Sequence, residues 1–212
     1  MQLRHIALAL LTVSTLAACG SAKDASKSNF AKAINERLEK NCTELRFNFL
    51  AQMAAKTETG GYPVDVATRE GRPAEEQRSA PFDVLEKVGL LQSKPKQVQD
   101  GFGPMQAMVP GKEYVLTDAG KKALKDPSKL PFCVGHRQVD EVVQFTEPSN
   151  AMGQTVSETV YTSSLVDVPA WANDDAVKAA FPELTQELQP KKQARAVLVL
   201  MNDGWTSEPS LF

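Results

Sequence analysis

The chain has 212 residues, of which 42% are hydrophobic, and its formal net charge at pH 7 is −2. This length suits one larger domain or two small ones, and the hydrophobic content is sufficient for a real core. The small negative charge provides no overall electrostatic attraction to nucleic acid.

The N-terminal residues follow the order of a secretory signal. Arg4 precedes an apolar run of eleven residues, 6–16, and small residues then lead to Cys19. This run is too short for a membrane-spanning helix, which needs about 20 residues. The motif LAAC at positions 16–19 resembles the lipobox of bacterial lipoproteins.

The lipoprotein resemblance implies that residues 1–18 are a signal peptide, removed by a signal peptidase of type II. Cys19 would then carry a diacylglyceryl group and an acylated amine, because that is how the family is processed. Two or more acyl chains make membrane attachment stable. Gly20 stands where aspartate would retain a Gram-negative lipoprotein in the inner membrane. The resemblance therefore implies an outer-membrane anchor facing the periplasm.

A polar tether and a long helix follow in the sequence. Residues 19–29 are rich in Ser, Lys and Ala without apolar periodicity, which predicts a short tether. Apolar residues then recur every three or four positions, which predicts one amphipathic helix over residues 30–55. Its apolar stripe consists of Phe30, Ile34, Leu38, Cys42, Leu45, Phe49 and Met53.

The middle of the chain resembles a known DNA-binding fold. Residues 56–80 are expected to form a loop, with a short strand at 62–66, and a helix is expected over 81–91. An extended segment or hairpin at 94–109, a strand at 114–117 and a helix at 118–125, capped by Thr117, complete this part. The stretch FDVLEKVGLLQSK…KEYVLTDAGKKAL, within residues 82–124, resembles the end of a winged-helix domain.

Winged helices commonly bind DNA, but the charges of this segment do not suit that role. Residues 94–129 contain seven lysines against four acidic residues and no arginine, the side chain that most often reads guanine. An exported protein also does not meet the chromosome. We therefore expect no nucleic-acid partner and, if the shape is present, a protein-contact module.

The C-terminal part favours antiparallel strands. Strands are predicted at 138–146 and 154–166, a helix beginning after Asn173 and interrupted at Pro182, and an interior strand at 194–201. The fold class predicted for the whole chain is α+β. A long N-terminal helix and a winged-helix-like subdomain occupy 30–130, and a β-β-α-β antiparallel-sheet subdomain occupies 131–212.

The cysteine count favours one disulfide. If Cys19 carries lipid, Cys42 and Cys133 remain, and an oxidising compartment favours a bond between them. The alternative is a metal site, because Cys133 and His136 have C-x-x-H spacing and Cys42 could add a third ligand. A structural zinc site usually has four such ligands, so we expect neither metal nor cofactor.

No motif indicates an enzyme. His136 is the only histidine after residue 18, and no nucleophile elbow, H-E-x-x-H, phosphate loop or dinucleotide fingerprint occurs. The acidic residues between 140 and 188 could do acid–base chemistry, although a solvated acidic face is the simpler interpretation. They are Asp140, Glu141, Glu147, Glu158, Asp167, Asp174, Asp175, Glu183 and Glu187.

These observations predict a lipid-anchored cell-envelope protein that is not an enzyme and acts as a protein-interaction or structural module. Its partners would be the membrane, through Cys19, and another envelope protein or a second copy of itself. A small-ligand or glycan-binding lipoprotein that uses Trp171 or Trp205 is the alternative, and a carboxylate-dependent hydrolase is a further one.

Overall fold

A computed structural model describes residues 21–68, 73–101, 103–151 and 153–207. The predictions for the signal peptide and for Cys19 lie outside these residues. Within the described part of the chain, no helix is both long and apolar enough to span a membrane.

Two antiparallel sheets and six α-helices make up the described chain. One sheet has the strand order β1-β3-β2, and the other has the order β4-β6-β7-β8 with β5 paired to β6. In chain order the elements are α1 (Lys27–Lys40), α2 (Phe49–Ala54), β1 (Val64–Ala67), α3 (Pro73–Lys87), β2 (Leu91–Asp100), η1 (Gly103–Met105), β3 (Ala107–Leu116), α4 (Asp118–Ala123), β4 (His136–Phe145), β5 (Ser149–Ala151), β6 (Gln154–Val166), η2 (Ala170–Asn173), α5 (Asp175–Ala180), α6 (Pro182–Glu187), β7 (Lys192–Met201) and β8 (Gly204–Thr206).

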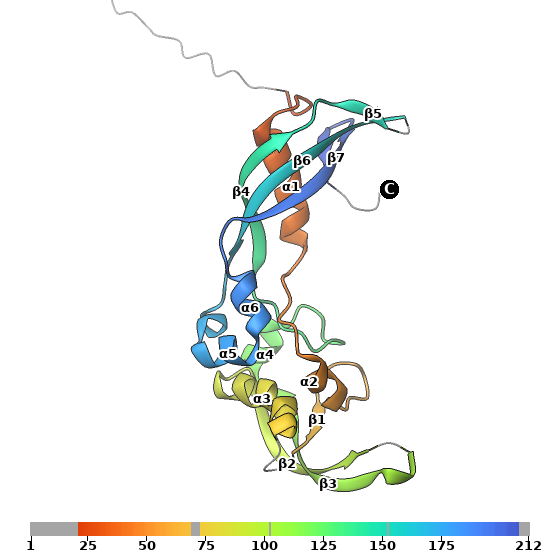
Figure 1. The fold of residues 1–212 in the computed structure, drawn as a ribbon, viewed down its shortest axis with the longest axis vertical. Helices are drawn as coiled ribbons and strands as arrows, with labels where there is room; N and C mark the ends of the chain where they lie inside the picture. The colour runs from red at the N-terminus through yellow and green to blue at the C-terminus, as the bar shows by residue number, and fades with distance from the viewer. Residues whose placement is uncertain (1–20, 69–72, 102, 152, 208–212) are drawn as a thin grey trace, which may run out of the picture.

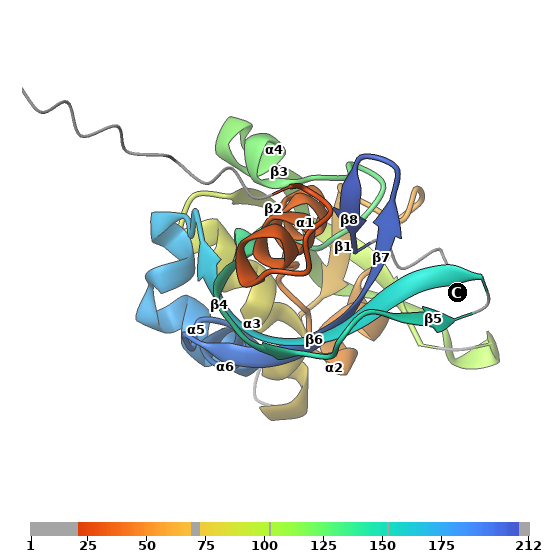
Figure 2. The same cartoon turned by 90° about the horizontal axis from the view of Figure 1, so that it is seen from above.

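The molecule is elongated and consists of two units placed end to end (Figure 1). The proximal unit contains α1 and the sheet of β4–β8, and seen from above this sheet curves around α1 (Figure 2). The distal unit contains α2, α3, α4, α5, α6 and the sheet of β1–β3. The chain passes between the units four times, at 41–48, 124–135, 167–174 and 188–191.

Each unit has its own hydrophobic core, and each core combines segments from both sides of residue 130. In the proximal core, α1 packs on strands that follow it by more than a hundred residues; the buried members are Phe30, Ala33, Ile34, Val142, Tyr161, Ala196, Leu198 and Trp205. In the distal core, α5 and α6 pack with elements of the first half, and its largest buried side chains include Tyr114, Phe82, Phe132, Phe181, Leu45, Leu85 and Leu91.

The described chain is folded from its first residues onward. Ser26 caps α1 by accepting the Asn29 N–H at 3.3 Å. The Asn29 side chain donates to the carbonyl oxygens of Ser21 and Asp24, and the Trp205 indole N–H donates to the Lys23 carbonyl at 3.1 Å. These bonds hold residues 21–26 against the end of the proximal unit.

The predicted fold class is wrong. It placed a long helix and a helical, winged-helix-like part in the first half and a sheet in the second half. The described residues form a mixed structure in which strand exceeds helix and both sheets are interleaved with short helices along the chain. Residues 82–124 supply the end of α3, the β2–β3 hairpin and α4, and β1 adds to that hairpin.

The single helix predicted over residues 30–55 is also wrong. Helix α1 ends at Lys40, because Asn41 has extended backbone angles, and α2 begins only at Phe49. Between them Leu45 and Phe47 are buried while Glu44, Arg46 and Asn48 are exposed, which is the alternation of a strand. Leu45 and Phe49 also fit a helical stripe, so the local pattern could not distinguish the period of a helix from that of a strand.

Candidate functional site

A disulfide joins two of the segments that connect the units. The predicted bond between Cys42 and Cys133 is confirmed, with their Cα atoms 5.7 Å apart. Cys42 directly follows α1 of the proximal unit, and Cys133 precedes β4. The bond therefore fixes the place where the chain leaves the proximal unit against the place where it returns.

The same two segments pair through their backbones. The bonds are Thr43 N–H to Gly135 at 2.8 Å, Leu45 N–H to Phe132 at 2.8 Å and Val134 N–H to Thr43 at 2.9 Å. On its other side the returning segment pairs with the end of α4, where the Cys133 N–H donates to the Ala123 carbonyl at 2.9 Å. These three segments pair through isolated β-bridges outside the two sheets; we call them together the junction sheet and call residues 43–46 its outer strand.

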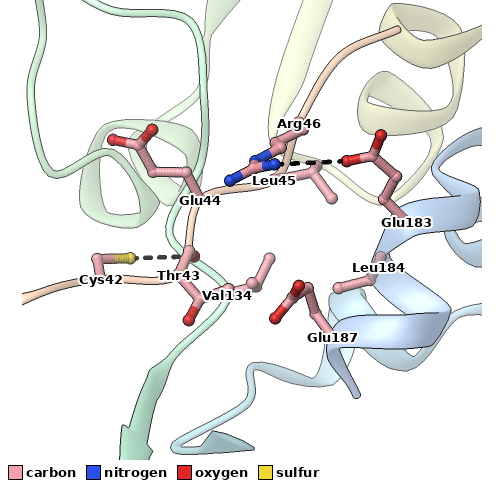
Figure 3. A pocket seen from close by; sticks show the side chains of 9 residues that line it. All are labelled: Cys42, Thr43, Glu44, Leu45, Arg46, Val134, Glu183, Leu184 and Glu187. Atoms are coloured by element: carbon pink, nitrogen blue, oxygen red, sulfur yellow. Dashed lines mark hydrogen bonds and ion pairs between the residues drawn. The ribbon is translucent and has the colours of Figure 1, made fainter. Parts of the chain in front are cut away.

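A cleft of about 270 Å³ lies between this outer strand and α6 (Figure 3). We call it the junction cleft; its lining is Cys42, Thr43, Glu44, Leu45, Arg46, Val134, Glu183, Leu184 and Glu187. Arg46 and Glu183 form an ion pair across it at 3.9 Å. The dashed line in Figure 3 from the Cys42 sulfur to the Thr43 carbonyl oxygen marks a close contact and not a hydrogen bond, because a disulfide sulfur carries no proton.

The C-terminal end of α6 is held to the proximal sheet beside the cleft. Arg137, on β4, donates to the Glu187 carboxylate at 2.7 Å and to the Glu187 carbonyl at 2.9 Å. Lys192 donates to the other carboxylate oxygen at 2.9 Å. Burial raises the pKa of Glu187, but these two cations together lower it by more, so the pKa lies below the ordinary value of 4.5.

An exposed apolar surface continues from the cleft along the same segment of chain. Phe49, the first residue of α2, is 72% exposed, and Met53 on the same helix is 49% exposed. Two hollows of about 510 Å³ each flank Phe49. The first shares Arg46 and Glu183 with the junction cleft, so the three hollows adjoin one another.

Among the described residues, no charged side chain lines the second hollow beside Phe49. Besides Phe49 and Asn48 it is formed by Leu50, Ala80, Pro81, Ala179, Ala180 and Pro182. Residues of α2, α3, α5 and α6 therefore present mainly small apolar side chains around an exposed aromatic ring. We call Phe49, Met53 and the lining of both hollows the Phe49 surface. An apolar patch of this kind is suited to contact another protein.

The two predicted ligand-binding tryptophans lie in different units. Trp205 is 7% exposed and packs edge-to-face on Phe30 with ring centroids 4.8 Å apart, at the edge of a hollow of about 470 Å³. Trp171 packs edge-to-face near Phe132 and borders a hollow of about 410 Å³ beside the disulfide. The structure does not bring the two rings into one site.

The residues considered for chemistry are dispersed. His136 lines the hollow at Trp171, with its Nδ1 atom 3.4 Å from the exposed Asp167 carboxylate. Among the described residues, no group of three or more His, Cys, Asp or Glu side chains is arranged to hold a metal ion. Glu158, Glu183 and Glu187 each form an ion pair with a cation.

Comparison with known proteins does not add to this description. No protein-family model, curated protein or solved structure matches the chain.

Sequence reasoning missed both the junction cleft and the Phe49 surface. Phe49 was assigned to a buried helical stripe, and the outer strand at 43–46 was assigned to the same helix. The available signal was the alternation of polar and apolar residues from Glu44 to Asn48, which suits a strand with one buried face, although Leu45 and Phe49 also fit a helical stripe.

Proposed function

We propose that the chain is a lipid-anchored cell-envelope protein, attached to the outer membrane through Cys19, that binds another envelope protein through its Phe49 surface. The observation that carries the binding role is the exposed Phe49 ring between two hollows, one of them lined by uncharged side chains in the described part of the chain. Large aromatic side chains that fill or border pockets are typical centres of protein–protein contacts.

The arrangement of the units supports this role. The described fold begins at Ser21, two positions after Cys19, and residues 21–26 are bonded to the proximal unit. A lipid on Cys19 would therefore hold that unit at the membrane. The Phe49 surface belongs to the distal unit at the other end of the long axis, where α2 and α3 lie (Figure 1).

The anchor is tested by replacing its cysteine. Cys19→Ser should abolish incorporation of radiolabelled palmitate and move the protein from the membrane to the soluble fraction of lysed cells. Val143→Ser serves as the control, because it introduces a serine at an exposed position without touching the lipid site or the disulfide. Unchanged palmitate labelling of Cys19→Ser would exclude lipidation at this position.

The binding surface is tested by crosslinking in intact cells. A photo-crosslinking amino acid at Met53 should give a discrete adduct, and the same residue at the exposed Val143 of the proximal unit should not. Adding Phe49→Ser should remove the adduct without lowering stability, since most of that ring is in solvent. An adduct with a second copy of the chain would assign the surface to self-association. Equal labelling from positions 53 and 143 would exclude a specific surface.

A further inference from the structure

The outer strand at residues 43–46 has backbone groups that face away from its partner. Thr43 and Leu45 direct their N–H and C=O groups toward residues 132–135. In an extended strand, alternate residues direct these groups to opposite sides. The N–H and C=O groups of Glu44 and Arg46 therefore lie on the free side, and no hydrogen bond between described residues uses them.

The free side of this strand borders the junction cleft. Glu44 and Arg46 both line the cleft, but the Glu44 carboxylate points away from it (Figure 3). The main chain of residue 44 is thus the part that reaches the cleft. The opposite wall is α6, and Leu45 and Leu184 supply apolar side chains between them. The cleft therefore combines a backbone edge that can form hydrogen bonds with apolar side chains that can contact a bound segment.

The ion pair across the cleft is easily opened. The side chains of Arg46 and Glu183 are 79% and 66% exposed, and their charged atoms are 3.9 Å apart. Exposed pairs of this kind contribute about 0–1 kcal/mol. An incoming chain could displace the Arg46 side chain without disturbing buried residues. The ion pair therefore does not block access to the backbone of the outer strand.

We infer that the outer strand at 43–46 accepts an extended segment of a partner protein, which adds a strand to the small junction sheet. Strand addition of this type takes its affinity from main-chain hydrogen bonds and its specificity from alternate side chains. The Glu187 carboxylate is held by Arg137 and Lys192, whereas Glu183 faces the cleft and, within the described chain, pairs only with the exposed Arg46. Displacing Arg46 leaves the Glu183 carboxylate without its cation, so the segment should carry Lys or Arg. This inference rests on the proposed protein-binding function and adds that the partner binds through an extended segment.

The cleft continues into the Phe49 surface, so a bound segment can extend from one to the other. The cleft and the first hollow share Arg46 and Glu183, and both hollows share Phe49. A segment paired with residues 44–46 can therefore place its next apolar side chain beside Phe49. The expected partner segment is extended, with a basic residue followed by an apolar one.

Two variants of one residue separate main-chain pairing from side-chain contact. Arg46→Pro removes the N–H donor and fills its position with ring atoms, whereas Arg46→Ala removes the side chain beyond Cβ and keeps the N–H donor. Both lose the Glu183 ion pair, so they are matched. Proline requires the preceding residue to be extended, and residue 45 already lies in an extended segment paired with Phe132.

The probe is a phage-displayed library of random dodecapeptides, panned against the solubilised full-length protein. We expect enriched peptides with a basic residue and an apolar residue, bound within about fivefold by the wild type and Arg46→Ala, and at least tenfold more weakly by Arg46→Pro. In the wild type, the peptide should slow amide hydrogen exchange at Glu44 and Arg46. This second readout needs no variant and serves if Arg46→Pro does not fold.

The inference is overturned if no peptide is enriched over a library panned on the support alone. It is also overturned if enriched peptides leave the amides of residues 44 and 46 unprotected, or if a folded Arg46→Pro binds them as the wild type does. The proposed function is judged separately by the Met53 adduct. An adduct that persists in Arg46→Pro would support binding at the Phe49 surface and contradict strand addition at residues 43–46.

Discussion

Arg137 and Glu187 connect the two units of the molecule through a side chain that is largely shielded from water. The Arg137 guanidinium is 16% exposed and lies 2.7 Å from the Glu187 carboxylate. Arg137 also donates to the Glu187 carbonyl at the C-terminal end of α6 and to the Ser163 carbonyl on β6. A cation at a helix C-terminus satisfies free carbonyl groups and interacts favourably with the helix dipole.

This contact predicts a pH-dependent contribution to stability. The pKa of Glu187 is lower in the folded chain than its ordinary value of 4.5. Its carboxylate therefore stabilises the fold above about pH 4.5, and this contribution disappears as the pH falls through the folded pKa. Because the side chain is 36% exposed, we expect Glu187→Gln to lower the free energy of unfolding by only about 1 kcal/mol at pH 7.

The control for that measurement lies one helical turn earlier. Glu183→Gln makes the same chemical change in an exposed pair, and it should cost less than about 0.5 kcal/mol. Urea denaturation at pH 7 and at pH 3 measures both variants. The Glu187→Gln effect should shrink at the lower pH. Equal losses in the two variants, or a loss independent of pH, would contradict the assignment.

Removing the disulfide should destabilise the whole chain. Cys42 and Cys133 are 91 positions apart in the sequence, and in the chain-entropy model a loop of this size contributes about 4–5 kcal/mol. We expect the double variant Cys42→Ala/Cys133→Ala to lose about this amount in denaturant unfolding. A reductant should lower the midpoint of the wild type but not that of the variant. A loss below about 1 kcal/mol would show that the junction is held by its other contacts.

Gly120, in the segment that resembles a winged helix, lies where α4 approaches the backbone after α3 most closely. The Thr117 hydroxyl accepts the Gly120 N–H at the start of α4 and lies 2.7 Å from the Gly89 carbonyl, to which it donates. This brings α4 so close to the end of α3 that a Cβ on residue 120 would lie 2.1 Å from the Leu90 carbonyl oxygen. Only glycine fits here without a shift of the backbone.

We therefore expect Gly120→Ala to lower the free energy of unfolding by about 1–3 kcal/mol, the range for overpacking. Helix propensity alone predicts the opposite sign, because alanine in a helix is about 1 kcal/mol more favourable than glycine. Lys121→Ala, at the next position of the same helix and exposed, should change stability little. Thermal or urea unfolding decides between the two signs, and a stabilised Gly120→Ala would refute the close approach.

Local patterns predicted several elements but not their arrangement. The richness of residues 154–166 in Thr, Val, Ser and Tyr predicted β6 with its observed bounds, and Thr117 caps α4 as expected. These depend on neighbours in the sequence. The packing of α1 on β4 and β8 depends on contacts more than a hundred residues apart, and single-sequence periodicity contains no information about them.

The candidate site was predictable only at the disulfide. Two cysteines outside the expected lipid site, in a compartment expected to be oxidising, were enough to predict the Cys42–Cys133 bond, but not what it joins. The outer strand at 43–46 exists because residues 132–135 pair with it, and that pairing overrides any tendency toward helix. Phe49 is exposed because α2 begins there, after the extended segment, so its ring no longer continues the stripe of α1.

The hydrogen bond from Trp205 to Lys23 should determine how firmly the first residues are attached. Trp205→Phe keeps a ring against Phe30 but removes the indole N–H that reaches the Lys23 carbonyl at 3.1 Å. We expect a loss of about 1 kcal/mol in stability and faster hydrogen exchange in residues 21–26. Trp171→Phe is the matched control, since the Trp171 indole N–H donates no hydrogen bond within the described chain. Mass spectrometry of exchanged peptides measures both variants. If residues 21–26 exchange equally in both variants, the contacts with α1 rather than the Trp205 hydrogen bond hold this segment.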